Sequence, residues 1–171
     1  MKPFQKLTAV AAPLPEANID TDIIFPARFL LLLEKKGIGA HLFNERRAKT
    51  ATRNARFVLD QPPFDPAEIL VAGANFGVGS SREHAVWALA DFGIRCVIAP
   101  SFGEIFYANC FKNGVLPIVL SHRDTDAVMT DAQQGKPVTV DLEAQSVRLS
   151  DGRAMDFEID AFRKRPASRP R

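Results

Sequence analysis

The chain has 171 residues, of which 46% are hydrophobic and 25% are charged, and its net charge is +2. This length predicts a single domain with a real hydrophobic core, over residues 1–163, and the balanced charge does not indicate a nucleic-acid-binding protein. There is no apolar run long enough for a membrane span and no apolar signal-peptide centre at the start, so we expect a cytoplasmic protein.

The first third of the chain predicts irregular structure around a few short elements. Residues 4–12 predict a strand, and residues 18–22 a turn rich in Asn and Asp. Residues 28–35, with the leucine-rich segment 29–33, have the composition of a helix, and part of that segment should be covered by the fold or by a partner. Residues 44–54 are polar and without hydrophobic periodicity, which predicts a loop. Residues 57–59 predict a short strand or edge element.

The middle of the chain alternates between strand and helix patterns. Strands are predicted at 69–72, 96–99 and 115–120, and helices at 81–92 and 101–113. This alternation is typical of parallel α/β units. A short helix at 125–134 and strands at 138–142, 146–149 and 155–159 follow, the last two joined by a hairpin at 150–152. Residues 164–171 are predicted to be a disordered basic tail.

The stretch 73–85, GANFGVGSSREHA, lies between a predicted strand and a predicted helix. A glycine-rich turn that leads into a helix aims free backbone N–H groups at one point, which favours binding of an anion. Ser80, Ser81 and Arg82 add two hydroxyls and a planar cation that matches a carboxylate or phosphate. The alternative is a capping box, with Ser80 as N-cap and Glu83 bonding back to it. A cap alone requires neither the glycines nor an arginine in the first turn, so we favour the anion site.

Metal ligation by this chain alone is not indicated. Its two cysteines, Cys96 and Cys110, form no C-x-x-C pair, and its three histidines are scattered. The spacing fits neither a zinc site nor the ligands of an iron–sulfur cluster. We expect His84 to be a packing residue, because a helix N-terminus disfavours its protonation, and His41 and His122 to be ordinary surface or core histidines.

Several ordered motifs resemble the 3-isopropylmalate dehydratase small-subunit family of the aconitase superfamily. The resemblance runs from about residue 18 to about residue 164. It is carried by NIDTDII (18–24), PARFL (26–30), GVGSSREHA (77–85), APSF (99–102), CFKNG (110–114) and FEID (157–160). It implies the swivelling β/β/α domain of the aconitases, an α/β fold with a mixed sheet, parallel βαβ units and a C-terminal antiparallel part. A typical member continues beyond residue 165 into another apolar segment, whereas this chain ends in a Pro- and Arg-rich tail.

The resemblance also implies an activity and a partner. Members isomerise a hydroxy acid by removing water and adding it back the other way round, here between 2-isopropylmalate and 3-isopropylmalate in leucine biosynthesis. The family's Lewis acid is a [4Fe-4S] cluster. The cluster is expected on a separate large subunit, in a heterodimer or heterotetramer, with the active site at the interface. Two alternatives stay open: a related dehydratase acting on citraconate/2-methylmalate or homoaconitate, and a non-catalytic anion-binding paralogue.

Site residues follow from the matching motifs. The family's serine base maps onto Ser80, although spacing alone does not choose between the two adjacent serines. Asp22, a catalytic candidate, and Thr21 match a segment near the reacting centre, with a plain Asx-turn as the nearly even alternative. The remaining substrate-binding candidates are Ser81, Arg82, Arg28, Gly77 and Gly79. Residues 28–39 match the specificity region, and their apolar character favours an alkyl-bearing substrate, unless the leucines only form core.

Overall fold

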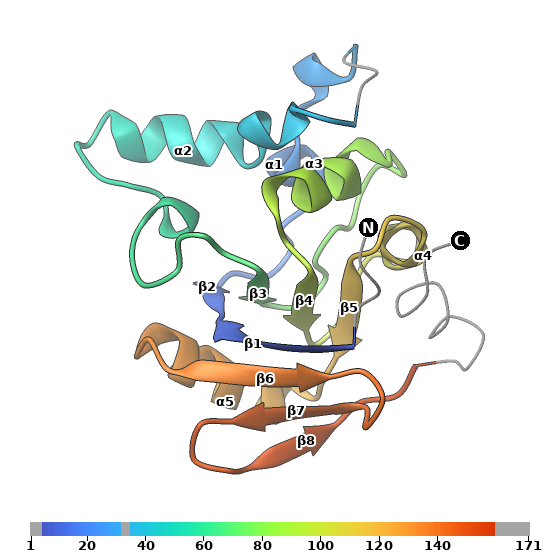
Figure 1. Ribbon diagram of the computed structural model, residues 1–171. Helices are drawn as coiled ribbons and strands as arrows, with labels where there is room; N and C mark the ends of the chain where they lie inside the picture. The colour runs from blue at the N-terminus through green and yellow to red at the C-terminus, as the bar shows by residue number, and fades with distance from the viewer. Residues whose placement is uncertain (1–4, 32–34, 160–171) are drawn as a thin grey trace.

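The computed structural model describes residues 5–31 and 35–159, and its strands form two four-stranded sheets (Figure 1). One sheet is parallel throughout, in the order β2 (Ala12–Leu14), β3 (Ile69–Ala72), β4 (Cys96–Ala99) and β5 (Leu116–Val119). The other is antiparallel, in the order β1 (Lys6–Val10), β6 (Pro137–Asp141), β7 (Ser146–Leu149) and β8 (Ala154–Asp156). The α/β class and the C-terminal antiparallel part are confirmed, but the two kinds of pairing form separate sheets rather than one mixed sheet.

The parallel sheet is built from consecutive βαβ units. Helix α3 (His84–Phe92) connects β3 to β4, and α4 (Glu104–Lys112) connects β4 to β5. Every residue of β3 and β4 is buried, as expected of parallel strands that are covered on both faces. The predicted alternation of strands and helices in this region is confirmed.

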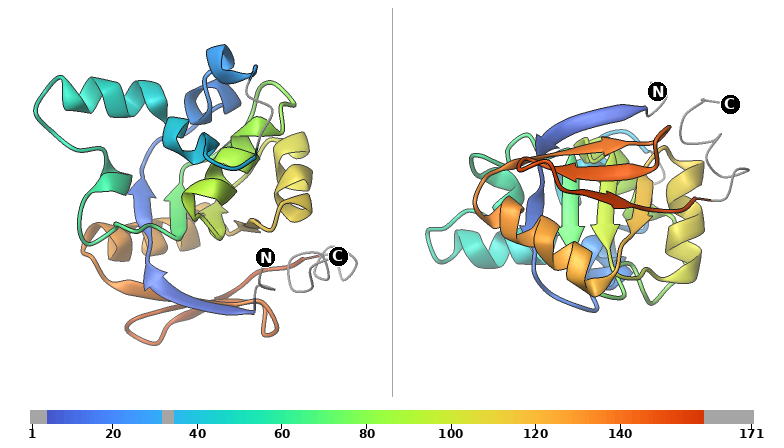
Figure 2. Two further views of the ribbon diagram at one scale, coloured as in Figure 1. Left: turned by 45° about the horizontal axis from the view of Figure 1, so that its top comes forward. Right: turned by 90° about the horizontal axis from the view of Figure 1, so that it is seen from below.

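Side chains alternate across the parallel sheet and so build two hydrophobic clusters. Leu70 and Ala72 pack with residues of α3 on one face, whereas Ile69 and Val71 pack on the other face with α5 (His122–Gln133) and the antiparallel sheet. The parallel sheet is therefore the central layer, between α3 on one side and the antiparallel sheet with α5 on the other (Figure 2).

The segment between β2 and β3 differs most from the expectation. It contains α1 (Thr21–Ile24), η1 (Ala27–Phe29), η2 (Ile38–His41), α2 (Asn44–Ala51) and η3 (Val58–Asp60). Where a helix was predicted at 28–35, the described residues form only the single turn η1, and Leu32–Glu34 lie outside the described residues. The strand predicted at 57–59 is wrong, because η3 occupies this place.

The loop predicted at 44–54 is also wrong, because α2 forms there. No residue of α2 is buried, so the helix has no apolar face that a periodicity argument would detect. It is held instead by ion pairs: Arg47 donates to both carboxylate oxygens of Asp60, at 2.9 and 2.7 Å, and Arg46 donates to Glu16.

The basic tail 164–171 lies outside the described residues. Within residues 5–31 and 35–159, no helix combines the length and the apolar character that crossing a membrane requires.

Candidate active site

Two loops that leave neighbouring parallel strands run side by side and bring the sequence motifs together. Leu14 at the end of β2 is in register with Ala72 at the end of β3, so both chains leave the sheet at the same edge. Backbone hydrogen bonds then connect residues 16–21 to residues 73–78. They are Gly73 N to Glu16 O (3.1 Å), Asn18 N to Ala74 O (2.7 Å), Gly77 N to Ile19 O (2.7 Å) and Thr21 N to Val78 O (2.9 Å). This pairing places the 18–24 motif directly beside the 77–85 motif.

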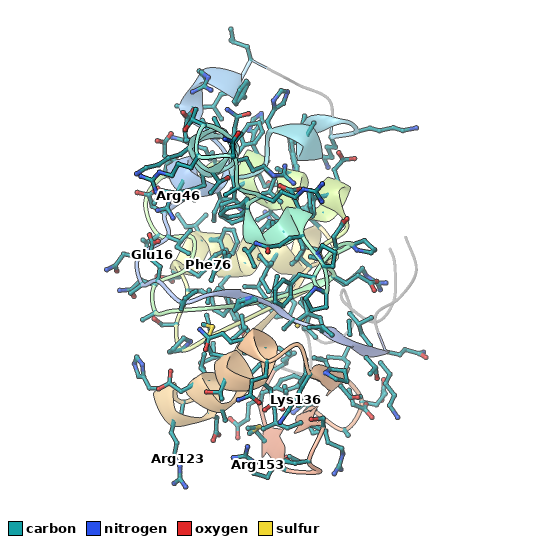
Figure 3. All side chains as sticks on the ribbon, turned by 90° about the vertical axis from the view of Figure 1, so that its left-hand side faces the viewer. Glu16, Arg46, Phe76, Arg123, Lys136 and Arg153 are labelled. Atoms are coloured by element: carbon teal, nitrogen blue, oxygen red, sulfur yellow. The ribbon has the colours of Figure 1, made fainter. Side chains whose placement is uncertain are left out.

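An ion pair fixes the first of these loops to α2. Arg46 donates two hydrogen bonds to the two carboxylate oxygens of Glu16, at 2.8 and 2.7 Å (Figure 3). The Arg46 guanidinium lowers the pKa of Glu16, mainly through this hydrogen bond. Because the pair lies near the surface, its net contribution to stability is about 1 kcal/mol or less. Its geometric consequence is to join α2 to the loop that leads to Thr21 and Asp22.

Both glycines of the turn adopt conformations that other residues avoid. Gly77 has a φ of +79° and Gly79 a φ of +99°. A Cβ at Gly77 would overlap the ring of Phe106, whereas a Cβ at Gly79 would lie 3.5 Å from Thr21 Oγ1. Gly77 is therefore required both by its backbone and by the close approach of α4, and Gly79 chiefly by its backbone.

We expect Gly77→Ala to destabilise the chain strongly. An alanine in the left-handed region costs about 1–2 kcal/mol, and the overlap with Phe106 adds roughly 1–3 kcal/mol. Chemical denaturation measures the loss in free energy of unfolding for Gly77→Ala and for the control variant Gly152→Ala. Gly152 has a φ of +95° but open space around its Cβ position, so this control loses only the backbone term. Equal losses in the two variants would contradict the packing role of Gly77.

The centre of the site is a cluster of Ser80, Arg82 and Asp22. The Arg82 guanidinium donates from Nε to Ser80 Oγ at 3.1 Å and from Nη1 to Asp22 Oδ1 at 3.3 Å. Nη1 also lies 3.4 Å from the carbonyl oxygen of Phe25. Asp22 Oδ1 in addition accepts the backbone N–H of Ala27 at 2.9 Å. Arg82 is thus held between the two motifs, with its cation next to the Ser80 hydroxyl.

The cluster is open to solvent and rich in donors. Ser80 and Ser81 are exposed, the Asp22 side chain is 64% exposed, and that of Arg82 is 17% exposed. Within the described part of the chain, the backbone N–H groups of Gly79, Ser80 and Ser81 donate no hydrogen bond. Such unpaired donors beside a guanidinium are suited to binding an anion or to stabilising a developing negative charge.

The capping box, which was the alternative to the anion site, does not form. Helix α3 begins at His84 rather than at Ser81, and Glu83 occupies the N-cap position without a capping hydrogen bond from its side chain. Its carboxylate instead accepts hydrogen bonds from Trp87 Nε1 and Asn113 Nδ2. Ser80 is therefore free of a capping role. His84 packs as expected: the centre of its ring lies 5.8 Å from that of Phe25, in a stacked arrangement, and 4.6 Å from that of Trp87, in a tilted one.

Two predicted substrate-binding residues lie outside this cluster. Thr21 is only 2% exposed and packs against Gly79. Arg28 forms an ion pair with Glu45 of α2, and its guanidinium lies 4.7 Å from the centre of the Phe29 ring. The Phe29 ring in turn stacks on His41 at 4.1 Å. The residue directly before the specificity region, Ala27, nevertheless donates its backbone N–H to Asp22 of the cluster.

Sequence reasoning missed a polar contact that holds the two loops together. Asn75 donates from Nδ2 to Asn18 Oδ1 at 2.9 Å, and its backbone N–H donates to Ser101 Oγ at 2.9 Å. Asn18 and Asn75 both have a φ of +61°, a conformation that asparagine adopts more readily than most residues. A signal was present in the sequence for Asn75 and Ser101, because each follows a strand predicted in the parallel α/β region.

The residues that the structure describes contain no cluster of three or more His, Cys, Asp or Glu side chains that suits a metal ion. Cys96 and Cys110 are fully buried, and burial raises the pKa of each thiol well above its usual value. They are neutral core residues rather than thiolate ligands.

Comparisons with known proteins agree with this geometry. Residues 1–123 match the family model described as the aconitase C-terminal domain, and residues 126–161 match the model LeuD_N. The chain is 55% identical over 167 residues to the 3-isopropylmalate dehydratase small subunit of Dinoroseobacter shibae, covering 96% of this chain and 83% of that protein. It is 56% identical, with the same coverage, to that of Rhizobium meliloti.

A solved structure supports the same assignment. The crystal structure of 3-isopropylmalate dehydratase from Methanocaldococcus jannaschii superposes with a TM-score of 0.73 at 27% identity, over 93% of this chain and 86% of that one. Together with the two adjacent motifs at the carboxyl edge of the parallel sheet, these similarities show that the chain belongs to the 3-isopropylmalate dehydratase small-subunit family of the aconitase superfamily.

Proposed function

We propose that this chain is the small subunit of a cytoplasmic hydro-lyase that interconverts 2-isopropylmalate and 3-isopropylmalate in leucine biosynthesis. The observation that carries the proposal is the cluster of Ser80, Arg82 and Asp22, assembled from two motifs at the ends of neighbouring strands. The names of the relatives, which are more than half identical to this chain, support the substrate.

Ser80 is the proposed base. In the dehydration step the Ser80 alkoxide takes a proton from the substrate carbon and becomes a hydroxyl, and the C–H electrons form the double bond. The leaving hydroxyl group takes a second proton from a general acid of the completed site and departs as water. Rehydration reverses these events with the hydroxyl on the other carbon. A serine needs stabilisation of its anion to act as a base. The Arg82 Nε–H at 3.1 Å from Ser80 Oγ and the free N–H groups of residues 79–81 offer that stabilisation.

The remaining residues of the cluster bind and orient the substrate. Arg82 is the proposed clamp for one substrate carboxylate, with Ser81 and the backbone N–H of Gly79 as further donors. Asp22 orients the Arg82 guanidinium through its Oδ1 atom. Thr21 and Gly77 contribute by fixing the backbone on which this cluster stands. The apolar residues 29–31, among which Leu31 is 91% exposed, offer a surface for the isopropyl group, and Arg28 at their start is a second candidate for a carboxylate.

A partner chain completes the site in this proposal. The family implies a [4Fe-4S] cluster, but the described residues of this chain do not fit it, because Cys96 and Cys110 are buried neutral thiols on adjoining elements of the core. We therefore place the [4Fe-4S] cluster on a large subunit. This subunit covers the exposed Ser80–Arg82 segment in a heterodimer or heterotetramer. The small-subunit name of the relatives supports such a partner.

Co-expression with the large subunit tests the proposal. We expect this chain alone to be colourless and without turnover, and the purified complex to convert 2-isopropylmalate at a higher kcat/KM than citraconate, 2-methylmalate or homoaconitate. Absorbance of the unsaturated intermediate reports the dehydration step. A stoichiometric iron–sulfur cluster on this chain alone would contradict the assignment of the cofactor, and a clear preference for another hydroxy acid would reassign the substrate.

A further inference from the structure

The segment 79–82 is attached to the rest of the protein by few contacts. Its residues belong to no helix or strand. Within the described part of the chain, the backbone between Gly79 and Arg82 makes no hydrogen bond to another backbone group. The position of Ser80 therefore depends on the residues that flank it and on side chains. A catalytic group that is out of place by about 1 Å can cost a large factor in rate.

Two consecutive side chains at the end of this segment extend to different elements. Arg82 bonds toward α1, through Asp22 and the carbonyl oxygen of Phe25. Glu83 bonds toward α3 and α4: its Oε2 atom accepts from Trp87 Nε1 at 3.0 Å and from Asn113 Nδ2 at 3.1 Å. The segment is thus held between α1 on one side and the end of α4 on the other.

The contact at the Glu83 carboxylate is built into the fold. Asn113 is the C-cap residue of α4, and its Nδ2 atom also donates to the carbonyl oxygen of Asn109 at 2.9 Å. The backbone carbonyl of Glu83 accepts the N–H groups of Val86 and Trp87, which begins the first turn of α3. Both the side chain and the backbone of Glu83 therefore fix where α3 starts.

The charge of this carboxylate is compensated locally. Burial opposes its ionisation, but the hydrogen bonds from Asn113 and Trp87 and the charges of Lys112 and Lys35 outweigh burial and hold the pKa of Glu83 below its usual value. Glu83 is therefore ionised at neutral pH. Hydrogen bonds to an ionised acceptor are stronger than those to a neutral one, which suits a residue that anchors a loop.

We propose that Glu83 is a positioning residue that holds the Ser80–Arg82 segment in its reactive geometry by joining it to Trp87 of α3 and Asn113 of α4. This inference rests on the proposed function for its kinetic consequence, but the anchoring itself does not depend on it. Glu83 touches neither substrate nor base in this arrangement, and it acts through the backbone of residues 80–82.

The test combines kinetics of the assembled complex with amide hydrogen exchange of residues 77–88. We expect Glu83→Ala to lower kcat about tenfold with little change in KM, and to accelerate exchange at Val86 and Trp87, whose backbone N–H groups donate to the carbonyl oxygen of Glu83. Glu83→Gln keeps an oxygen that accepts from both donors, so we expect it to stay within about threefold of the wild type on kcat and to retain slow exchange. Trp87→Phe removes the indole N–H donor to Glu83 together with one of the two fused rings. It should show an intermediate effect, and it replaces Glu83→Ala in the test if that variant does not fold.

Ser121→Ala is the matched control. It removes the side-chain cap of α5, which accepts from Asp124 N at 3.0 Å on the other side of the parallel sheet, and should cost about 1 kcal/mol of stability. If this control loses as much kcat as Glu83→Ala, or if exchange at Val86 and Trp87 is unchanged in Glu83→Ala, the inference is overturned. A wild-type complex that turns over no hydroxy acid would overturn the proposed function, while the exchange experiment would still decide the anchoring role.

Discussion

Replacing Ser80 with alanine in the assembled complex is expected to lower kcat by about a hundredfold to ten-thousandfold, the range that a general base contributes. The reason is that the proton acceptor is removed while the Arg82 cation and the free N–H groups of the turn remain. Steady-state kinetics with 2-isopropylmalate, followed through the absorbance of the unsaturated intermediate, measures the effect. Because Ser80 is exposed and does not cap α3, the free energy of unfolding should change by only about 0.5 kcal/mol or less.

The adjacent serine provides the matched control for this experiment. Ser81 is also exposed, and its hydroxyl makes no hydrogen bond to the described residues. We expect Ser81→Ala to raise KM and to lower kcat/KM by about tenfold, as the loss of one hydrogen bond of roughly 1.5 kcal/mol to a charged group would do. If Ser81→Ala abolishes turnover while Ser80→Ala retains it, the base is Ser81.

Arg82→Lys is expected to lower kcat/KM by about tenfold to a hundredfold. Lysine keeps the positive charge but loses the planar fork, so a bidentate contact with a carboxylate becomes a point contact. The bonds from Nε to Ser80 Oγ and from Nη1 to Asp22 Oδ1 cannot both be replaced by one ammonium group. Charge-assisted bonds of roughly 1.5–3 kcal/mol account for the expected factor. The melting temperature should hardly change, because the contact with Asp22 is long and that carboxylate is largely exposed.

Arg47 provides the control for structural damage, because its replacement should affect stability rather than kinetics. Arg47 of α2 donates from Nε and Nη2 to both oxygens of Asp60 and from Nη1 to the carbonyl oxygen of Leu42. Arg47→Lys should lower the melting temperature and leave kcat/KM unchanged. If Arg82→Lys shows this same pattern, Arg82 is a structural ion-pair partner, and Arg28 becomes the next candidate for the carboxylate clamp.

The site that these experiments probe is assembled across a sheet edge rather than within one segment. Asp22 and Arg82 are sixty positions apart in the chain, and they meet because β2 and β3 are parallel neighbours. The general rule that ligands bind outside the carboxyl ends of parallel strands therefore describes this cluster. The same edge holds the Asn18–Asn75–Ser101 contact, which ties together the loops after β2, β3 and β4.

The amino-acid sequence was sufficient to predict the central βαβ units and to select the candidate residues of the glycine-rich turn. The strands at 69–72 and 96–99 match β3 and β4 in their bounds, because a short run of buried apolar residues leaves few alternatives. Gly77 and Gly79 have the positive φ values that a glycine-rich turn predicts. The family was also recognisable, because several motifs in fixed order are far more specific than any one of them.

Tertiary structure decided the features whose stabilisation comes from distant residues. Helix α2 forms without an apolar face because Glu16 and Asp60 hold its arginines, and no local pattern contains that information. The chain passes from β1 to β2 between two sheets, which only strand pairing reveals. The SxxE motif also fitted a cap, but in the folded chain the Glu83 carboxylate accepts from Trp87 and Asn113 instead. A sequence motif records which groups are present, whereas the nearest donors and acceptors in the folded chain determine which of them meet.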